Sequence, residues 1–313
     1  MRLLAKGIKG KYKEQGRIEF ITTAVEHPCV LNSAEYSESL CIKVHFIPVD
    51  GTGKIDMDAF KAVLCEKTLF VSVMMANNEI GTIQDLKQIT QFAKDAGAFV
   101  HTDAVQAVGK IPVNAAELGV DYLTMSAHKI YGPKGIGALY IRDKAPLYPL
   151  IHGGHQEDGM RAGTYNNLGI LGFGKAAELS KQGLEEYGKT TGFLKKKLAE
   201  GLLEKIPNIK INGHKTEALP NTLNVSFPGA EGEAILLSMD LAGIEVSTGS
   251  ACASGSLEPS HVLLATGMGP ELAHGSIRFS LGMGTNEKEI DFVLETLPPI
   301  IARLRSMSTV ESA

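Results

Sequence analysis

The sequence has only four cysteines, no long apolar run and little net charge, and each shortage excludes a class of protein. Cys29, Cys41, Cys65 and Cys252 are scattered and lack CxxC spacing, so we expect no metal centre and no disulfide framework. Free thiols are typical of the reducing cytoplasm, where we expect the protein to act. No stretch approaches membrane-spanning length, and no signal-peptide core is present near the first residue. The net charge of −4 gives no reason to expect nucleic acid or an anionic membrane as a partner.

What the sequence does contain is an alternation of strand and helix patterns in its first half. Leu69–Met75 is a continuous apolar run with valines, which predicts a buried parallel strand. Asp85–Asp95 has helical spacing of apolar residues and is stopped by Gly97. A strand that ends at Asp103, another that ends near Ser126, and a third over Ile136–Ile141, antiparallel after a Gly-Pro turn, are expected to follow. This order predicts an α/β domain with a mainly parallel sheet.

The second half predicts a smaller α+β domain. Helical patterns extend from about Leu168 to Lys205, and we expect further helices and strands at Glu231–Leu241, Lys288–Ser306, Asn221–Ser226 and Glu245–Ser247. The 313 residues are enough for two domains. We place the large domain at residues 1–185 and the small domain at residues 186–313.

Two residues suggest a cofactor. Lys129 follows a predicted buried strand and precedes a glycine turn, and partial burial there would lower the pKa of its amine toward the range needed to attack a carbonyl. Asp103 ends the preceding strand. Pyridoxal 5′-phosphate (PLP) needs one lysine for its aldehyde and one carboxylate for its ring nitrogen, and ligands of open α/β sheets gather at the carboxyl ends of strands. The alternatives are a surface lysine at a strand end and a helix-capping aspartate.

Cys252 lies in a segment of small polar residues and glycines, and we expect residues 247–258 to form a mobile, exposed loop. A thiol in such a loop is suited to sulfur relay, and we interpret Cys252 as reactive. Cys41, between Leu40 and Ile42, and Cys65, beside Leu64, are instead expected to be core residues.

Six segments resemble, in the same order, the motifs of the PLP-dependent cysteine desulfurases. They are Glu26–Pro28, Asn77–Gly81, His101–Gln106, Ser126–Gly135, Arg161–Thr164 and Ser247–Cys252. The resemblance covers essentially the whole chain and is greatest to the long-loop group, which includes the nitrogenase-type and housekeeping iron–sulfur-cluster enzymes. It implies a fold-type I, aminotransferase-like architecture, a homodimer, L-cysteine as substrate, and a sulfur-acceptor or iron–sulfur scaffold protein as partner.

The resemblance also implies roles for individual residues. Lys129 would bind PLP covalently and move protons, Asp103 would pair with the pyridinium nitrogen, and Gln106 would hydrogen-bond the phenolic oxygen. His27 would stack on the ring and relay protons, although a helix cap beside Pro28 is the alternative.

The remaining roles concern the phosphate, the substrate and the sulfur. Ser126 and His128 would bind the PLP phosphate, and Thr164 would contact the phosphate bound by the partner subunit. The substrate carboxylate would be held by Asn78 and by Arg278, which lies in the alternating strand Ser276–Ser280 and could otherwise be a surface salt-bridge residue. The thiolate of Cys252 would attack the substrate sulfur, leaving alanine and a persulfide.

One departure from the family concerns the N-terminus. Family members carry several dozen upstream residues with a phosphate-binding turn at a helix N-terminus, and Met1–Gly10 resembles only the helix that follows this turn. We expect either a shortened sequence or weakened PLP binding. The chain also lacks the long C-terminal tail of housekeeping members, which favours the nitrogenase-type branch. Two other functions stay open: another fold-type I enzyme, such as a selenocysteine lyase or aminotransferase, and a non-catalytic homologue that is defective in PLP binding.

Overall fold

The computed structural model describes residues 15–249 and 258–307, which form two compact units. Unit 1 contains residues 15–48, 55–76 and 84–182, and unit 2 contains residues 49–54, 77–83 and the described residues from Gly183 onward. The longest part of each unit meets the other between Gln182 and Gly183 along the chain. The two short excursions into unit 2 were not expected, and one of them carries Asn78.

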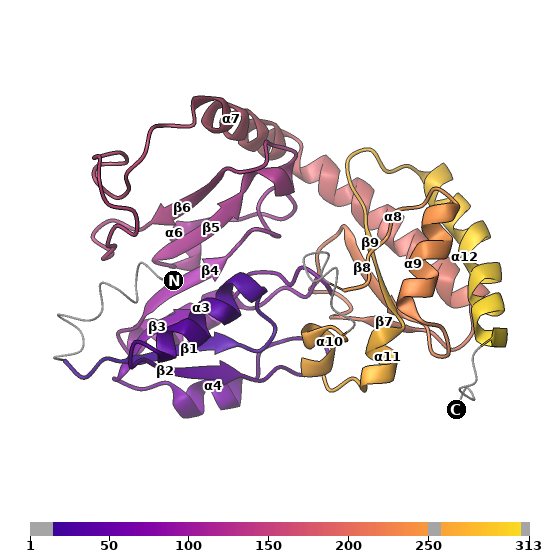
Figure 1. The fold of residues 1–313 in the computed structure, drawn as a ribbon, viewed down its shortest axis with the longest axis horizontal. Helices are drawn as coiled ribbons and strands as arrows, with labels where there is room; N and C mark the ends of the chain where they lie inside the picture. The colour runs from indigo at the N-terminus through magenta and orange to yellow at the C-terminus, as the bar shows by residue number, and fades with distance from the viewer. Residues whose placement is uncertain (1–14, 250–257, 308–313) are drawn as a thin grey trace. The chain divides into compact units, whose positions relative to one another are not determined.

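Unit 1 is built on a six-stranded sheet with the order β2-β1-β3-β4-β5-β6 (Figure 1). The first five strands in chain order run parallel, and β6 pairs antiparallel with β5, which confirms the predicted α/β class. The strands are β1 (Glu19–Thr23), β2 (Lys43–Ile47), β3 (Thr68–Ser72), β4 (Phe99–Asp103), β5 (Tyr122–Ser126) and β6 (Gly137–Ile141). The strand order reverses between β1 and β3, which is where open α/β sheets bind their ligands.

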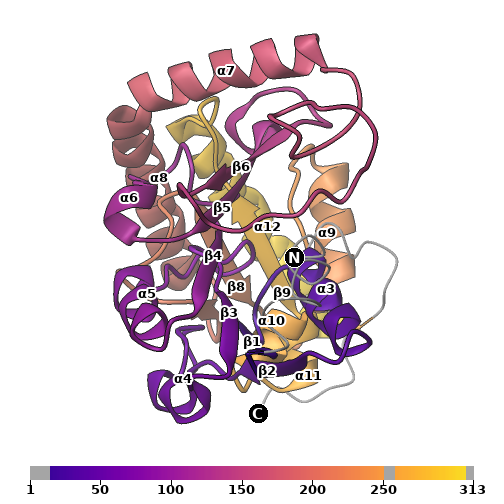
Figure 2. The ribbon, with the colours of Figure 1, turned by 90° about the vertical axis from the view of Figure 1, so that its left-hand side faces the viewer.

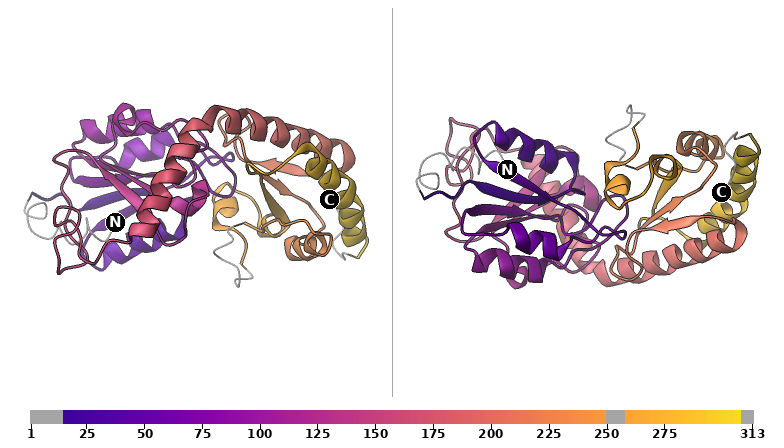
Figure 3. Two further views of the ribbon diagram at one scale, coloured as in Figure 1. Left: turned by 90° about the horizontal axis from the view of Figure 1, so that it is seen from above. Right: turned by 90° about the horizontal axis from the view of Figure 1, so that it is seen from below.

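Helices cover both faces of this sheet, so its central strands can be apolar throughout. All residues of β3 are buried, as its continuous apolar run predicted. Helix α3 lies on one face, and α4 and α5 lie on the other (Figures 2 and 3). The helical elements of unit 1 are α3 (Pro28–Glu38), α4 (Met57–Val63), α5 (Leu86–Asp95), α6 (Ala115–Leu118), the 3₁₀ turn η1 (Ala127–Ile130) and α7 (Asn167–Gln182).

Helix α5 shows which local interactions produce the sequence pattern that predicted it. The side chain of Asp85 accepts a hydrogen bond from Gln88 N and caps the first turn, and the helix buries Leu86 and Ile89 against the sheet. Gly97, with a φ of 74°, adopts the left-handed conformation that follows the last turn. The predicted helix over Asp85–Asp95 is therefore confirmed.

Unit 2 contains a three-stranded antiparallel sheet with the order β7-β8-β9, and several helices. The strands are β7 (Lys210–Asn212), β8 (Thr222–Ser226) and β9 (Ser276–Ser280), and the helices are α8 (Leu184–Lys205), α9 (Gly232–Leu241), α10 (His261–Ala265), α11 (Pro270–His274) and α12 (Glu287–Met307). The predicted strand over Glu245–Ser247 is wrong. Only Ser247 pairs with β9, through an isolated bridge to Arg278, because the chain turns away at Gly249, whose φ is 64°.

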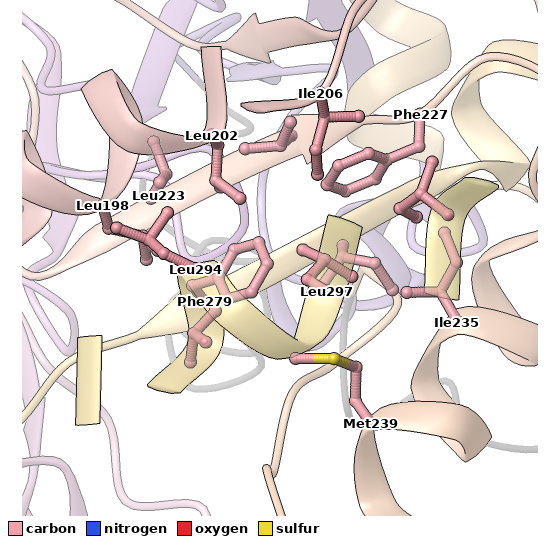
Figure 4. Packing of buried hydrophobic residues seen from close by; sticks show 14 of the residues in the cluster. Leu198, Leu202, Ile206, Leu223, Phe227, Ile235, Met239, Phe279, Leu294 and Leu297 are labelled. Carbon is pink, nitrogen blue, oxygen red and sulfur yellow. The ribbon is translucent and has the colours of Figure 1, made fainter. Parts of the chain in front are cut away.

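The core of unit 2 lies between its sheet and the helices α8, α9 and α12 (Figure 4). Leucines spaced by four residues along α8 meet the apolar face of α12, which is the spacing that places side chains on one helical face. The labelled members of this cluster are Leu198, Leu202, Ile206, Leu223, Phe227, Ile235, Met239, Phe279, Leu294 and Leu297.

The two cysteines expected in the core lie elsewhere. Cys41 is exposed and adopts a φ of 61°, because it sits in the turn after α3, where its neighbour Ile42 points inward instead. Cys65 is half-buried and follows the end of α4. A residue between two apolar neighbours can therefore be exposed when the chain turns at that residue.

The packing of α8 predicts a large contrast between adjacent leucines. Leu202 is fully buried, whereas Leu203 is 54% exposed. We expect Leu202→Ala to lower the free energy of unfolding by about 2–5 kcal/mol, because it leaves a cavity in the core of unit 2. Leu203→Ala is the matched control and should change stability by less than about 0.5 kcal/mol. Urea denaturation followed by circular dichroism measures both, and equal effects would contradict this account of the core.

Candidate functional site

The carboxyl ends of the parallel strands in unit 1 bring five of the predicted cofactor residues to one edge of the sheet. His27 follows β1, Asp103 is the last residue of β4, and Ser126 is the last residue of β5, with His128 and Lys129 directly after it in η1. Asp103, at the end of β4, pairs with Thr124, which lies two residues before the end of β5. Residues far apart in the sequence are thus neighbours at the edge where such sheets bind ligands.

Asp103 is a buried acid at this edge. The residue is 8% exposed, and Oδ1 accepts a hydrogen bond from Val105 N at 2.9 Å. Burial raises the pKa of the Asp103 carboxyl, and the hydrogen bond from Val105 and the nearby His27 offset part of this effect. The bond to Val105 caps a turn rather than a helix. A protonated pyridine nitrogen beside this carboxyl would favour its ionised form, so the residue is chemically suited to PLP.

The turn η1 keeps His128 and Lys129 out of the core because its other two residues are buried. Ala127 and Ile130 are buried and pack against Phe173 and Ala176 of α7. With these two residues fixed at spacing i, i+3, the intervening His128 is exposed and Lys129 is half-buried. The local sequence therefore positions the amine by packing its neighbours.

Ser126 and His128 form a polar pair beside Lys129. Ser126 Oγ lies 2.7 Å from His128 Nδ1, with the donor set by the tautomer of the ring. Partial burial lowers the pKa of His128, and the positive charges of Lys129 and Lys134 lower it further. A hydroxyl, an imidazole and two lysines make a set of groups that suits an anion such as a phosphate.

Two other predicted residues of unit 1 lie apart from this pair. Gln106 is in the turn after β4, and its carbonyl Oε1 accepts a hydrogen bond from Lys110 Nζ at 2.5 Å. This contact assigns the amide orientation, so the remaining NH₂ group is the one that could donate to a phenolic oxygen. Thr164 is exposed in the segment between β6 and α7. Within the described residues, no hydrogen bond or ion pair joins Thr164 to the group at the sheet edge.

His27 takes the capping role that the sequence offered as the alternative. It is the N-cap of α3, and its Nδ1 accepts a hydrogen bond from Cys29 N at 3.2 Å. This bond fixes the proton on the opposite nitrogen of a neutral ring, and it holds the imidazole near Asp103.

In unit 2, Asn78 and Arg278 lie next to each other. Arg278 Nη1 donates to the backbone carbonyl of Asn78 at 3.2 Å, and Arg278 Nε donates to Ser280 Oγ at 3.2 Å. Asn78 Oδ1 is buried without a hydrogen-bond partner among the described residues. The Asn78 Oδ1 atom can accept a hydrogen bond, and the neighbouring guanidinium of Arg278 can donate.

Cys252 lies outside the described residues. Among the residues that the structure does describe, no helix is both long and apolar enough to span a bilayer. The same residues hold no group of three or more potential metal ligands from His, Cys, Asp and Glu.

Comparison with known proteins places this geometry in a family. Residues 1–293 match the model of the family described as aminotransferase class-V. The chain is 48% identical over 305 residues to the cysteine desulfurase IscS of Clostridium botulinum strain Hall, covering 97% of this chain and 77% of that protein. It is 51% identical over 288 residues to cysteine desulfurase 2 of Trichormus variabilis, covering 92% and 72%.

Solved structures of NifS-like proteins have the same fold as this chain. A NifS-like protein superposes with a TM-score of 0.88 at 38% identity, covering 96% of this chain and 78% of that one. The NifS-like protein of Rickettsia africae gives 0.85 at 33% identity, covering 96% and 79%. This chain belongs to the cysteine desulfurases of the aminotransferase class-V family. The expected fold-type I architecture is thereby confirmed.

One buried acid of this cysteine desulfurase was not singled out from the sequence. Glu26 is fully buried, and its Oε1 accepts hydrogen bonds from Thr23 Oγ1 at 2.7 Å and from Met74 N at 2.8 Å. It therefore joins the end of β1 to the residues after β3, at the point where the strand order reverses. Burial raises the pKa of Glu26 to about 8, and the charge of Asp103 adds to the effect. Glu26 belongs to the Glu26–Pro28 motif found in the sequence, but a three-residue motif does not show whether its side chains are buried.

A second buried group stiffens the sheet beneath this edge. His101, in β4, contacts Ser72 Oγ of β3 through Nδ1 at 2.8 Å and Thr124 Oγ1 of β5 through Nε2 at 3.3 Å. Burial lowers the pKa of His101 to about 3, so the ring is neutral at physiological pH. The imidazole thus crosslinks three neighbouring strands without adding a charge below Asp103.

The protonated state of Glu26 predicts a pH-dependent effect of Glu26→Gln. The folded protein keeps the proton until about pH 8, whereas the unfolded chain releases it near 4.5, so the folded state binds more protons within this window. Stability of the wild type should therefore fall as pH rises through the window, by up to about 1.4 kcal/mol per pH unit for this one group. Glu26→Gln removes the titration, so its stability relative to the wild type should increase with pH.

Urea denaturation of both proteins between about pH 5 and about pH 8 measures this difference. An unchanged dependence of unfolding on urea concentration is the control that both proteins unfold through the same transition. A stability difference that stays constant across the window would show that Glu26 is ionised in the folded protein.

Proposed function

We propose that this chain converts L-cysteine to L-alanine and receives the sulfur as a persulfide on Cys252. The observation that carries the proposal is the placement of Asp103 and Lys129 at the ends of neighbouring parallel strands. That pair is the minimum a protein needs to hold PLP, and close relatives are named cysteine desulfurases. A persulfide-forming thiol also suits a reducing compartment such as the cytoplasm.

We assign PLP to the sheet edge of unit 1. Lys129 would hold it covalently, Asp103 would pair with its ring nitrogen, and Gln106 would donate to its phenolic oxygen. His27 would cover the ring, and the Ser126–His128 pair would bind the phosphate. In a homodimer, Thr164 would contact the phosphate bound by the partner subunit, which fits its exposure in this chain.

PLP, when bound, withdraws electrons from the α-carbon of an attached amino acid. The Lys129 amine would accept the α-proton, and His27 would move protons to and from the substrate. Asn78 and Arg278 would hold the substrate carboxylate, since a guanidinium matches a carboxylate with two parallel hydrogen bonds.

Sulfur transfer would then be a displacement at the substrate sulfur. The Cys252 thiolate forms a new S–S bond, the Cβ–S bond breaks, and its electron pair remains on the carbon fragment. Protonation of that fragment gives alanine, so one cysteine and one enzyme thiol become one alanine and one persulfide. The persulfide would pass to the thiol of an acceptor protein, such as an iron–sulfur scaffold.

Lys129→Ala tests the cofactor assignment. We expect borohydride reduction of the wild type with PLP to add the mass of one reduced PLP to the peptide that contains Lys129. Lys129→Ala should show no such addition, because only a neighbouring amine can form the covalent bond. Mass spectrometry of the digested protein is the measurement, and Lys87→Ala, at an exposed position of α5, is the control that should keep the modification. An unmodified wild type would exclude an enzyme of this class.

Cys252→Ala tests the sulfur step separately. We expect it to keep the visible absorbance of bound PLP and to lose both persulfide and cysteine-dependent alanine production, because no other thiol takes its place. Cys41→Ala is the matched control, since Cys41 is an exposed free thiol, and it should retain full activity. Persulfide formation in Cys252→Ala would refute the assigned role, and activity with selenocysteine alone would favour a selenocysteine lyase.

A further inference from the structure

Lys110 is a buried lysine beside one of the predicted cofactor residues of unit 1. It is 8% exposed, and its Nζ donates a hydrogen bond to Gln106 Oε1 at 2.5 Å. Lysine side chains are almost never buried to this extent unless they are paired. The proposed function gives Lys110 no part, so its burial against Gln106 calls for an explanation.

The turn after β4 brings these two side chains together. The backbone N–H groups of Ala107 and Val108 donate to Ala104 O at 2.9 Å and 3.0 Å, and Lys110 N donates to Ala107 O at 3.0 Å. Residues 105–110 thus form consecutive turns of helical character. Residues four apart lie on the same side of such turns, which explains why Lys110 reaches back to Gln106.

The backbone of this turn is anchored by packing. Ala104 and Ala107 are fully buried, and Val108 packs against the apolar cluster formed by η1 and α7. The turn η1 also carries Lys129, the predicted attachment point of PLP. The backbones of Gln106 and Lys129 are therefore held in one packed region, and the side-chain amide of Gln106 is the part that can still rotate.

The orientation of that amide decides what it offers to a ligand. A glutamine amide has an oxygen that accepts and an NH₂ group that donates, and a half-turn about its last side-chain bond exchanges them. The ammonium of Lys110 has donors and no acceptor, so only the amide oxygen of Gln106 can face it. The same contact polarises the amide and makes its NH₂ group a stronger donor.

We propose that Lys110 is a positioning residue that holds the Gln106 amide with its NH₂ group available to the phenolic oxygen of PLP. Without Lys110, the amide can turn its oxygen toward the phenolic oxygen, and two acceptors without a proton between them repel each other. A donor favours the negatively charged phenolic oxygen, so the orientation of this amide sets how readily the bound cofactor releases its proton. This inference rests on the proposed function, because that function places PLP beside Gln106.

The first test is the pH dependence of the absorbance of bound PLP in Lys110→Met, Gln106→Leu and the double variant. We expect the midpoint of the absorbance change to rise by about 0.5–1 pH unit in Gln106→Leu, which has lost the donor, and by up to the same amount in Lys110→Met. Spectrophotometric titration is the measurement. Lys87→Met, at an exposed position of α5, is the matched control and should leave the midpoint unchanged.

The double variant separates an effect through Gln106 from a direct effect of the Lys110 charge on the cofactor. If Lys110 acts by orienting the amide, its removal changes nothing once the amide is gone, so the double variant should have the midpoint of Gln106→Leu. A charge that acts directly on PLP would raise the midpoint in the double variant beyond that of Gln106→Leu, and this outcome would overturn the positioning role.

The second test needs no cofactor. In the protein without PLP, acetic anhydride should modify the buried Lys110 more slowly than the exposed Lys87. Gln106→Leu should raise the rate at Lys110 roughly three- to tenfold, because the amine loses the bond that holds it in place. Gln106→Glu should keep the slow rate, since its carboxylate can still accept that bond. Mass spectrometry of the digested protein gives the rate at each lysine, and the rate at Lys87 should be the same in every variant.

The outcomes separate this inference from the proposed function. A wild type that shows no absorbance of bound PLP overturns the function. A wild type that binds PLP, with an unchanged midpoint in Lys110→Met, overturns only the positioning role. Should Lys110→Met fail to fold, the acetylation rates decide, because equal rates at Lys110 in Gln106→Leu and Gln106→Glu would show that the contact does not hold the two side chains together.

Discussion

Parallel pairing of β1, β3, β4 and β5 is the constraint on which the candidate site depends. Parallel strands point their carboxyl ends toward one edge, and each needs a crossover before the next begins. The residues that follow each strand are therefore brought together at that edge, although they lie far apart in the sequence. His27, Asp103 and Ser126 share an edge for this reason alone, and no side-chain contact among them is required.

The electrostatics of this edge follow from burial. Asp103 and Glu26 are carboxyls with raised pKa values in one region, and the deeper Glu26 is held by neutral hydrogen-bond donors. Two interacting carboxyls cannot both ionise easily, so a protonated Glu26 places no negative charge against Asp103. The next strand contributes lysine, imidazole and hydroxyl groups at its end. Opposite charges are thus separated along the edge, which suits a ligand with a cationic ring nitrogen and an anionic phosphate.

Much of the fold could be predicted from the sequence, because its signals are local. The apolar run of β3, the cap and apolar face of α5, and the glycine after it are each contained in a few residues. The edge residues could also be predicted, since they directly follow such strands. Cys41 was misjudged because its apolar neighbours indicated a buried run, whereas a left-handed turn exposes it.

The contacts of Glu26 and Glu79 could not be predicted, because their partners are distant in sequence. Glu26 bonds Met74 N, 48 residues away, and Glu79 bonds Ser260, 181 residues away. Both acids stood in recognised motifs, yet a glutamate beside a functional residue can equally be a solvated surface group. Only the fold shows that each is buried and bonded to a second segment.

The passage of the chain from β3 into unit 2 connects these two acids. Met74, whose N–H is held by Glu26, lies at the end of unit 1, and Asn77 begins the excursion that contains Asn78 and Glu79. Hydrogen bonds from Gln84 N to Met75 O and from Asn77 N to Thr82 O close this excursion into a narrow hairpin. Glu26 therefore holds the start of this stretch through Met74 N, and Glu79 lies within the hairpin.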